Sequence, residues 1–100
     1  MPRVQHMVVV RFKPETEPGV PERMFAALHR LQRLLPGIEY VRGGPYASPE
    51  GLNEGFTHGF LVTFHDAAAR DHYLTDPEHE ALKADILPAV EQVIAFDFAE

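Results

Sequence analysis

Apolar and polar residues alternate along a stretch near the middle of the chain. One side of this stretch carries Phe56, His58, Phe60, Val62 and Phe64, and the other carries Thr57, Gly59, Leu61 and Thr63. Period-two alternation of aromatic and β-branched residues is typical of a β-strand. Because both sides carry apolar residues, we expect a strand that is covered on both faces and lies inside a sheet. A single histidine interrupts the apolar side of this central strand.

Three further segments have the pattern of strands, at residues 3–12, 38–42 and 90–98. In the first, His6 heads an apolar side that continues with Val8, Val10 and Phe12. In the last, Asp97 shares its side with small and apolar residues. The strand pattern therefore places a histidine and a carboxylate on apolar faces, where a polar group needs a partner.

The segments between these strands have apolar residues at the spacing of an α-helix. Apolar residues recur every three or four positions over 21–35, and Pro36-Gly37 ends this helix. Asp66 is a suitable N-cap for a second helix through Leu74. The Asp76-Pro77 pair then interrupts the chain and opens a third helix that ends near Leu87.

The order β-α-β-β-α-β predicts an α+β protein with a ferredoxin-like, four-stranded antiparallel sheet. Helices cover one face of such a sheet, and no segment is left to cover the other. The uncovered face would carry Val9, Leu61, Ile94, Phe96 and Phe98. A bare apolar face marks an interface, so we expect a homodimer that forms through the sheet faces.

Length and composition narrow the class of protein. One hundred residues indicate one domain over 1–100. The net charge of −6 and the scattered basic residues argue against a nucleic-acid partner. The chain has no cysteine, which excludes disulfides and thiol chemistry. It has neither a signal-peptide pattern nor an apolar run of membrane-spanning length, so we expect a cytoplasmic protein without a membrane partner.

Tyr73 and His79 stand on either side of the Asp76-Pro77 break, which allows both side chains to turn inward. A histidine near neutral pKa can take a proton from a carbon acid, and a phenol can donate a hydrogen bond to the enolate oxygen. Asp97 could hold an imidazole in one tautomer, and His6 should lie near it because the first and last strands are antiparallel neighbours. The alternative is structural: Tyr73 and His79 fix the turn, and Asp97 meets water.

His6 and His58 lie near the starts of antiparallel strands, so we expect them towards opposite ends of the sheet, on the order of 10 Å or more apart. That separation argues against a shared metal ion, whose ligands lie about 2 Å from it. We therefore predict no metal site. The alternative for both histidines is a hydrogen-bonded place in the core.

Several segments, in this order and spacing, resemble the stress-responsive dimeric A/B barrel domain family. They are residues 6–13, 35–38, 55–64, 73–74, 77–79 and 97–98. The resemblance implies a ferredoxin-like protomer whose sheet packs on that of a second protomer to form a barrel. Most members have no assigned function, and a few plant members are polyketide cyclases that close a linear polyketone by aldol condensation.

The resemblance also implies the site residues and their roles. His79 would be the base, Tyr73 the oxyanion donor and Asp97 the group that orients the histidine, with His6 as a further catalytic residue. No cofactor would be needed. The ligand would be a small apolar carbonyl compound, in a pocket with His58, Val8, Val10, Phe25, Leu28, Val41 and Phe60.

Two other functions stay open at this stage. In the first, the chain is a non-catalytic stress-response or assembly protein, whose product is the dimer itself. In the second, weaker one, it is a monooxygenase relative from the wider dimeric barrel superfamily, against which the absence of tryptophan counts. An open pocket beside His79 would favour an enzyme, and a sealed interior would favour the non-catalytic protein.

Overall fold

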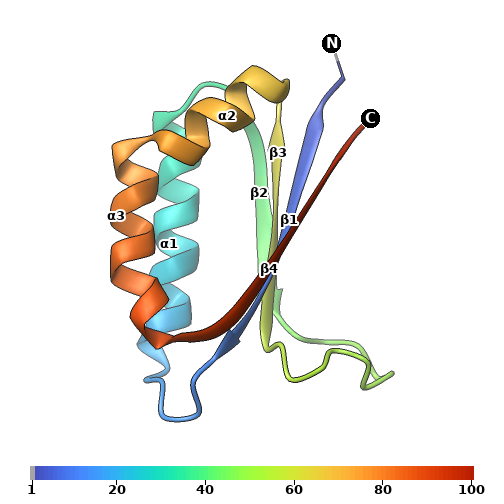
Figure 1. Ribbon diagram of the computed structural model, residues 1–100, viewed down its shortest axis with the longest axis vertical. Coiled ribbons are helices and arrows are strands. Elements are labelled where there is room, and N and C mark those ends of the chain that lie inside the picture. The colour runs from blue at the N-terminus through green and yellow to red at the C-terminus, as the bar shows by residue number, and fades with distance from the viewer. Residues whose placement is uncertain (1) are drawn as a thin grey trace.

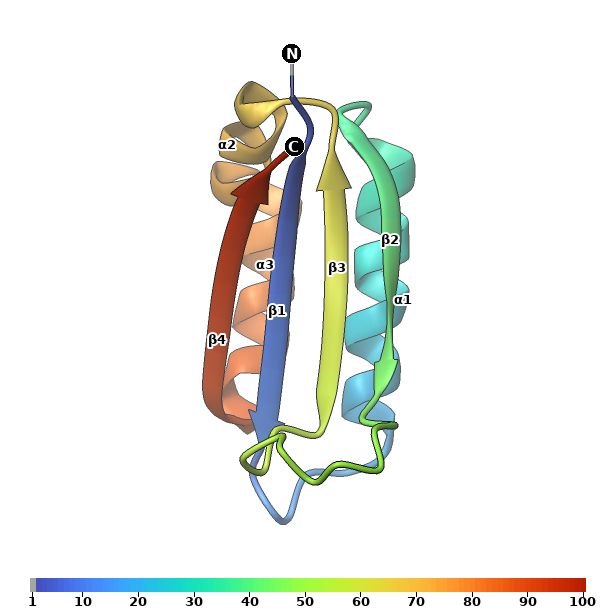
Figure 2. The same ribbon diagram turned by 90° about the vertical axis from the view of Figure 1, so that its right-hand side faces the viewer.

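Four strands form one antiparallel sheet in the order β2-β3-β1-β4 (Figure 2). The computed structural model describes residues 2–100, so Met1 of the predicted domain lies outside the described residues. The strands are β1 (Val4–Phe12), β2 (Ile38–Pro45), β3 (His58–Phe64) and β4 (Val90–Ala99). The alternating stretch in the middle of the chain is therefore an inner strand, β3, as its two apolar sides predict.

All helices lie on one face of the sheet (Figure 1). They are α1 (Gly19–Leu34), α2 (Ala67–Thr75) and α3 (Pro77–Ile86), followed by a 3₁₀ turn, η1 (Leu87–Ala89). Asp66 caps α2 by accepting a hydrogen bond from the Ala69 amide, and Asp76 caps α3 by accepting one from the Glu78 amide. These caps satisfy amides that have no partner inside a helix. They fix the sharp break between α2 and α3.

The ferredoxin-like fold is confirmed, with small differences at the ends of elements. β2 continues three residues beyond the predicted end at Arg42, because Gly43, Gly44 and Pro45 still pair with β3. Gly43 allows this pairing to continue under α1. A Cβ at Gly43 would lie 2.5 Å from the Gly59 carbonyl oxygen of β3 and 2.7 Å from the Phe25 ring of α1, so a larger residue would disturb the β2–β3 pairing and the packing of the helix.

The core lies between the helices and the face of the sheet that they cover. Its most deeply buried side chains are Leu28, Val62, Phe64 and Tyr73. The opposite face is uncovered in Figure 1, and a set of large apolar side chains is exposed there: Met7, Val9, Ile94, Phe96 and Phe98. Leu61 lies among them and is half-buried. We refer to these six residues as the open face.

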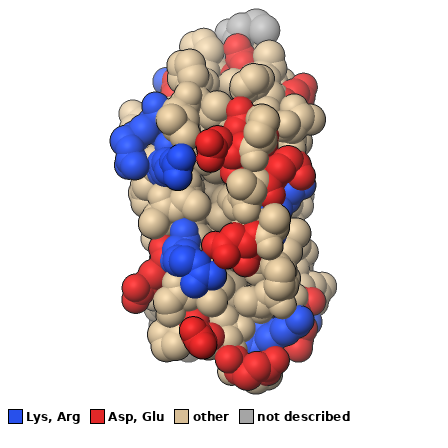
Figure 3. Space-filling view, turned by 90° about the vertical axis from the view of Figure 1, so that its left-hand side faces the viewer, with Lys and Arg blue, Asp and Glu red and all other residues tan. Residues whose placement is uncertain are grey.

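The outer surface of the helices is polar and carries interleaved charges of both signs (Figure 3). Three of its ion pairs join Arg23 to Asp85, Arg30 to Glu78, and Lys83 to Glu80. Exposed pairs of this kind contribute little to stability, and they mark a surface that faces water. None of the helices in residues 2–100 has both the length and the apolar character needed to cross a membrane.

Candidate functional site

A cavity of about 280 Å³ lies between the sheet and the α2–α3 pair. Three residues of the predicted pocket, Val8 and Val10 of β1 and Phe60 of β3, form part of its apolar wall. Its opening is lined by exposed apolar side chains, those of Leu74 and Val93 among them. The cavity is therefore open to solvent and suited to an apolar molecule.

Tyr73 and His79 form the polar end of this cavity, together with His6. The centres of the Tyr73 and His79 rings are 4.1 Å apart, and the His6 ring lies 5.9 Å from that of Tyr73. The break at Asp76-Pro77 allows this approach, because α2 and α3 leave it in different directions (Figure 1). The structure thus brings together three of the four residues predicted to be catalytic.

Burial keeps two of these groups neutral. Tyr73 is 1% exposed, and burial raises the pKa of its phenol well above the usual value. Burial also lowers the pKa of His79, an effect that the Leu74 carbonyl partly opposes. The Nδ1 atom of His79 is buried and has no hydrogen-bond partner within residues 2–100. A buried polar atom without a partner costs free energy. Because solvent does not reach Nδ1, the ring meets the open cavity through its other atoms.

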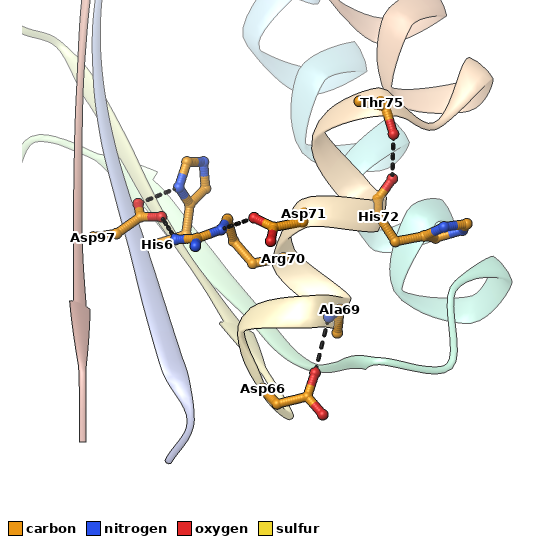
Figure 4. A network of polar contacts seen from close by, with 8 residues as sticks. All are labelled: His6, Asp66, Ala69, Arg70, Asp71, His72, Thr75 and Asp97. Carbon is orange, nitrogen blue, oxygen red and sulfur yellow. Dashed lines mark hydrogen bonds and ion pairs between the residues drawn. The ribbon is translucent and has the colours of Figure 1, made fainter. Parts of the chain in front are cut away.

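Asp97 joins His6 to a residue that the sequence did not indicate (Figure 4). Nδ1 of His6 lies 2.5 Å from Oδ1 of Asp97, and Arg70 donates from Nη1 to Oδ2 at 2.7 Å. The prediction that Asp97 accepts a hydrogen bond from His79 or His6 is confirmed for His6. Partial burial disfavours the Asp97 carboxylate, but the hydrogen bonds of His6 and Arg70 outweigh it and hold its pKa below the usual value.

The remaining predicted pocket residues lie elsewhere. His58 pairs with Val10 across the sheet, whereas His6 pairs with Val62, so the two histidines are four positions apart in register. His58 and Phe25 line a separate cavity of about 580 Å³ near the start of α1, and burial lowers the pKa of this histidine. Two others, Leu28 and Val41, are buried in the core and are not among the residues that line the cavity beside His79.

Sequence reasoning missed Arg70 and the contribution of α3 to the cavity wall. Arg70 is three residues before Tyr73 and so lies on the same side of α2. That spacing could have indicated that Arg70 faces the site. It does so only once the position of Asp97 next to α2 is known. Leu82, Lys83 and Ile86 of α3 also line the cavity. Lys83 borders the cavity, while its ammonium pairs with Glu80 on the outer surface of the helix.

The arrangement supports proton transfer by the protein's own side chains. His79 has a lowered pKa and can accept a proton, and the neutral phenol of Tyr73 can donate a hydrogen bond. Within residues 2–100, His, Asp and Glu side chains do not gather in threes as a metal site would require.

The fold and this cavity describe a small ferredoxin-like α+β domain, and the comparison with known families agrees with this class. The stress responsive A/B barrel domain matches residues 4–100. The chain therefore belongs to the stress responsive A/B barrel domain family, as its resemblance predicts.

Individual relatives are distant in sequence and similar in length. The chain is 26% identical to olivetolic acid cyclase from Cannabis sativa over 95 residues, covering 95% of this chain and 94% of that protein. A dimeric ferredoxin-like protein from Jannaschia sp. CCS1 superimposes with a TM-score of 0.83 at 28% identity, covering 96% of this chain and 97% of the other.

A third relative, a hydroxynitrile lyase from Passiflora edulis, superimposes with a TM-score of 0.88 at 24% identity. This match covers 98% of the chain and 93% of the lyase. At this level of identity, the likeness concerns the fold.

Proposed function

We propose that the cavity beside His79 binds a small apolar carbonyl compound and that the protein moves protons on it without a cofactor. The observation that carries this proposal is the His79 imidazole, which lines an open apolar cavity and whose pKa is lowered by burial. Tyr73 stacks on the same imidazole. A carbonyl compound in the cavity would meet a proton acceptor and a hydrogen-bond donor together.

The proposed reaction begins when His79 removes a proton from a carbon next to a carbonyl group. The electron pair of the broken C–H bond passes to the carbonyl oxygen, and the Tyr73 phenol donates a hydrogen bond to the resulting enolate. In an intramolecular aldol closure, the enolate carbon bonds to a second carbonyl carbon of the same molecule, and the oxygen of that carbonyl takes up a proton. The relation to olivetolic acid cyclase supports a ring closure of this kind.

His6 supplies a second imidazole at the same polar end of the cavity. Its Nδ1 is engaged by Asp97, so its Nε2 is the ring nitrogen left for a ligand. In this proposal, Asp97 orients His6, whereas the sequence placed it behind the base His79. His6 then receives or returns protons as a second proton-transfer group beside His79.

The alternative is a non-catalytic stress-response or assembly protein. A protein with that function should have a well-packed interior, because a cavity lowers stability and would serve no purpose in it. The opening lined by Leu74 and Val93 therefore favours the enzyme.

We also propose that the protein forms a homodimer through the open face. Two observations support this. The face carries a contiguous set of exposed large apolar side chains, among them Phe96 at 63% exposure, and the Jannaschia protein of similar fold is described as dimeric. A second copy of the same face would remove these side chains from water.

The test is a turnover assay with linear polyketones and other activated 1,3-dicarbonyl compounds. His79→Ala and Tyr73→Phe should each lower kcat/KM by about 10²-fold or more, because each removes a group used in the proton transfer. Both variants should remain dimeric. The matched control is His29→Ala, which changes an exposed histidine of α1 and should react like wild type.

Normal turnover by both cavity variants would exclude this mechanism. Absence of binding by every carbonyl compound tested, measured by thermal shift on the wild type, would favour the non-catalytic protein.

A further inference from the structure

Arg70 belongs to a chain of charged contacts that reaches the cavity through Asp97 and His6 (Figure 4). Its Nε donates to Oδ1 of Asp71 at 2.8 Å, and its Nη1 donates to Oδ2 of Asp97 at 2.7 Å. The other oxygen of Asp97 meets Nδ1 of His6. The guanidinium therefore bridges two carboxylates, one on its own helix and one on strand β4.

A neutral His6 carries a single ring N–H, so at most one of its two nitrogens can donate a hydrogen bond. Arg70 and His6 together hold the pKa of Asp97 below its usual value, although partial burial acts in the opposite direction. The carboxylate is thus ionised near neutral pH and can only accept. Nδ1 of a neutral His6 must then carry the proton, and its Nε2 must carry the lone pair.

We propose that Arg70 is a positioning residue that, through Asp97, fixes the tautomer of His6 so that the unprotonated Nε2 serves the cavity. Arg70 restrains Asp97 at Oδ2, and this leaves Oδ1 against the imidazole. Without that contact, the Asp97 side chain, which is about one-quarter exposed, is free to turn towards water. His6 would then lose the acceptor that selects one tautomer. Orientation of a histidine by a hydrogen-bonded carboxylate is an established catalytic device.

The position of Arg70 on α2 connects this role to Tyr73. The two residues are three positions apart, so they lie on the same side of α2. One turn of this helix therefore supplies both the Tyr73 phenol of the cavity and the guanidinium that binds Asp97. The catalytic meaning of this inference rests on the proposed function, because a fixed Nε2 matters only if His6 meets a substrate. The tautomer itself is a property of the free protein.

The experiment measures the His6 tautomer by ¹⁵N NMR on histidine-labelled protein near pH 8.5, where imidazoles are neutral. A His6→Gln sample assigns the signal. In the wild type, the ratio of Nδ1–H to Nε2–H should be about tenfold or more, which is the bias expected from one hydrogen bond to a charged group. A wild-type His6 with its proton on Nε2 would overturn the proposal.

Arg70→Met keeps most of the side-chain volume and removes the charge. It should lower the tautomer ratio by roughly tenfold, whereas Arg70→Lys, whose ammonium can still pair with Oδ2 of Asp97, should retain most of the bias. The matched control is Arg23→Met. Arg23 of α1 forms a forked pair with Asp85 of α3, far from the cavity end of Arg70, and its replacement should leave His6 unchanged.

If Arg70 only holds α2 against the sheet, Arg70→Met would lower the melting temperature and leave the tautomer as it is, and the proposal would be wrong. Should Arg70→Met fail to fold, Arg70→Gln provides the same comparison. Because no substrate is needed, a fixed tautomer in a protein that turns nothing over would remove the proposed function and leave this inference standing.

Discussion

Phe96 is the most exposed residue of the open face, and truncating it tests the proposed dimer directly. The side chain is 63% exposed in the single chain. Full burial of a phenylalanine stabilises by about 1.5–3 kcal/mol, so covering the exposed part contributes about 1–2 kcal/mol per copy. Twofold symmetry places two copies in one interface. Phe96→Ala should therefore weaken dimerisation by about 2–4 kcal/mol, or roughly 30- to 1,000-fold in Kd.

Sedimentation velocity over a series of protein concentrations measures this Kd, and far-ultraviolet circular dichroism verifies that the variant is folded. The matched control is Leu34→Ala, which truncates an exposed apolar residue at the end of α1, away from the open face. It should associate like the wild type. Leu61→Asp, which places a charge in the middle of the open face, should dissociate the dimer or prevent folding.

Two results would refute this reasoning. One is a wild-type protein that remains monomeric at micromolar concentration. The other is a Phe96→Ala variant whose Kd equals that of the wild type, because burial of this side chain is the stated source of affinity. Equal weakening by Leu34→Ala would point to a different interface, on the helical side of the molecule.

Two further predictions concern the stability of the protomer. The folded-state pKa of Asp97 is lowered, so its ionised form stabilises the fold above the unfolded-state pKa of about 4, and this contribution is lost as the pH falls through the folded-state value. Asp97→Asn should therefore melt below the wild type at pH 7, and the difference should shrink near pH 3; an equal gap at both pH values would contradict the ion pair. Leu28 is 1% exposed, so Leu28→Ala should lower the free energy of unfolding by about 2–5 kcal/mol in urea titrations at fixed protein concentration. A loss below about 0.5 kcal/mol, which is typical of surface positions, would place Leu28 outside the core.

The sequence by itself determined the elements and their order. Alternation in β1 and β3, the helical spacing of α1, and the breaks at Pro36-Gly37 and Asp76-Pro77 depend on residues close together in the chain. Such signals need no knowledge of distant contacts. The fold followed from them because few topologies join these elements in this order.

Part of the site was also within reach of the sequence. Antiparallel pairing of the first and last strands places His6 opposite Asp97, and the structure has this pair in register. The proline break made an approach of Tyr73 and His79 possible, although only the packing of α2 and α3 brings their rings to 4.1 Å. Periodicity assigns a residue to a face of its own element, and the register of a sheet extends that assignment to the neighbouring strand.

Tertiary structure alone decided which residues share a cavity. His58 and Phe25 face the helical layer as predicted, but they line a different cavity from His79 because the strands are long enough to separate two sites. Arg70 joined the site because its long side chain reaches from α2 to β4. Side-chain reach and the placement of helices over a sheet depend on packing among residues far apart in the chain, and no local pattern records them.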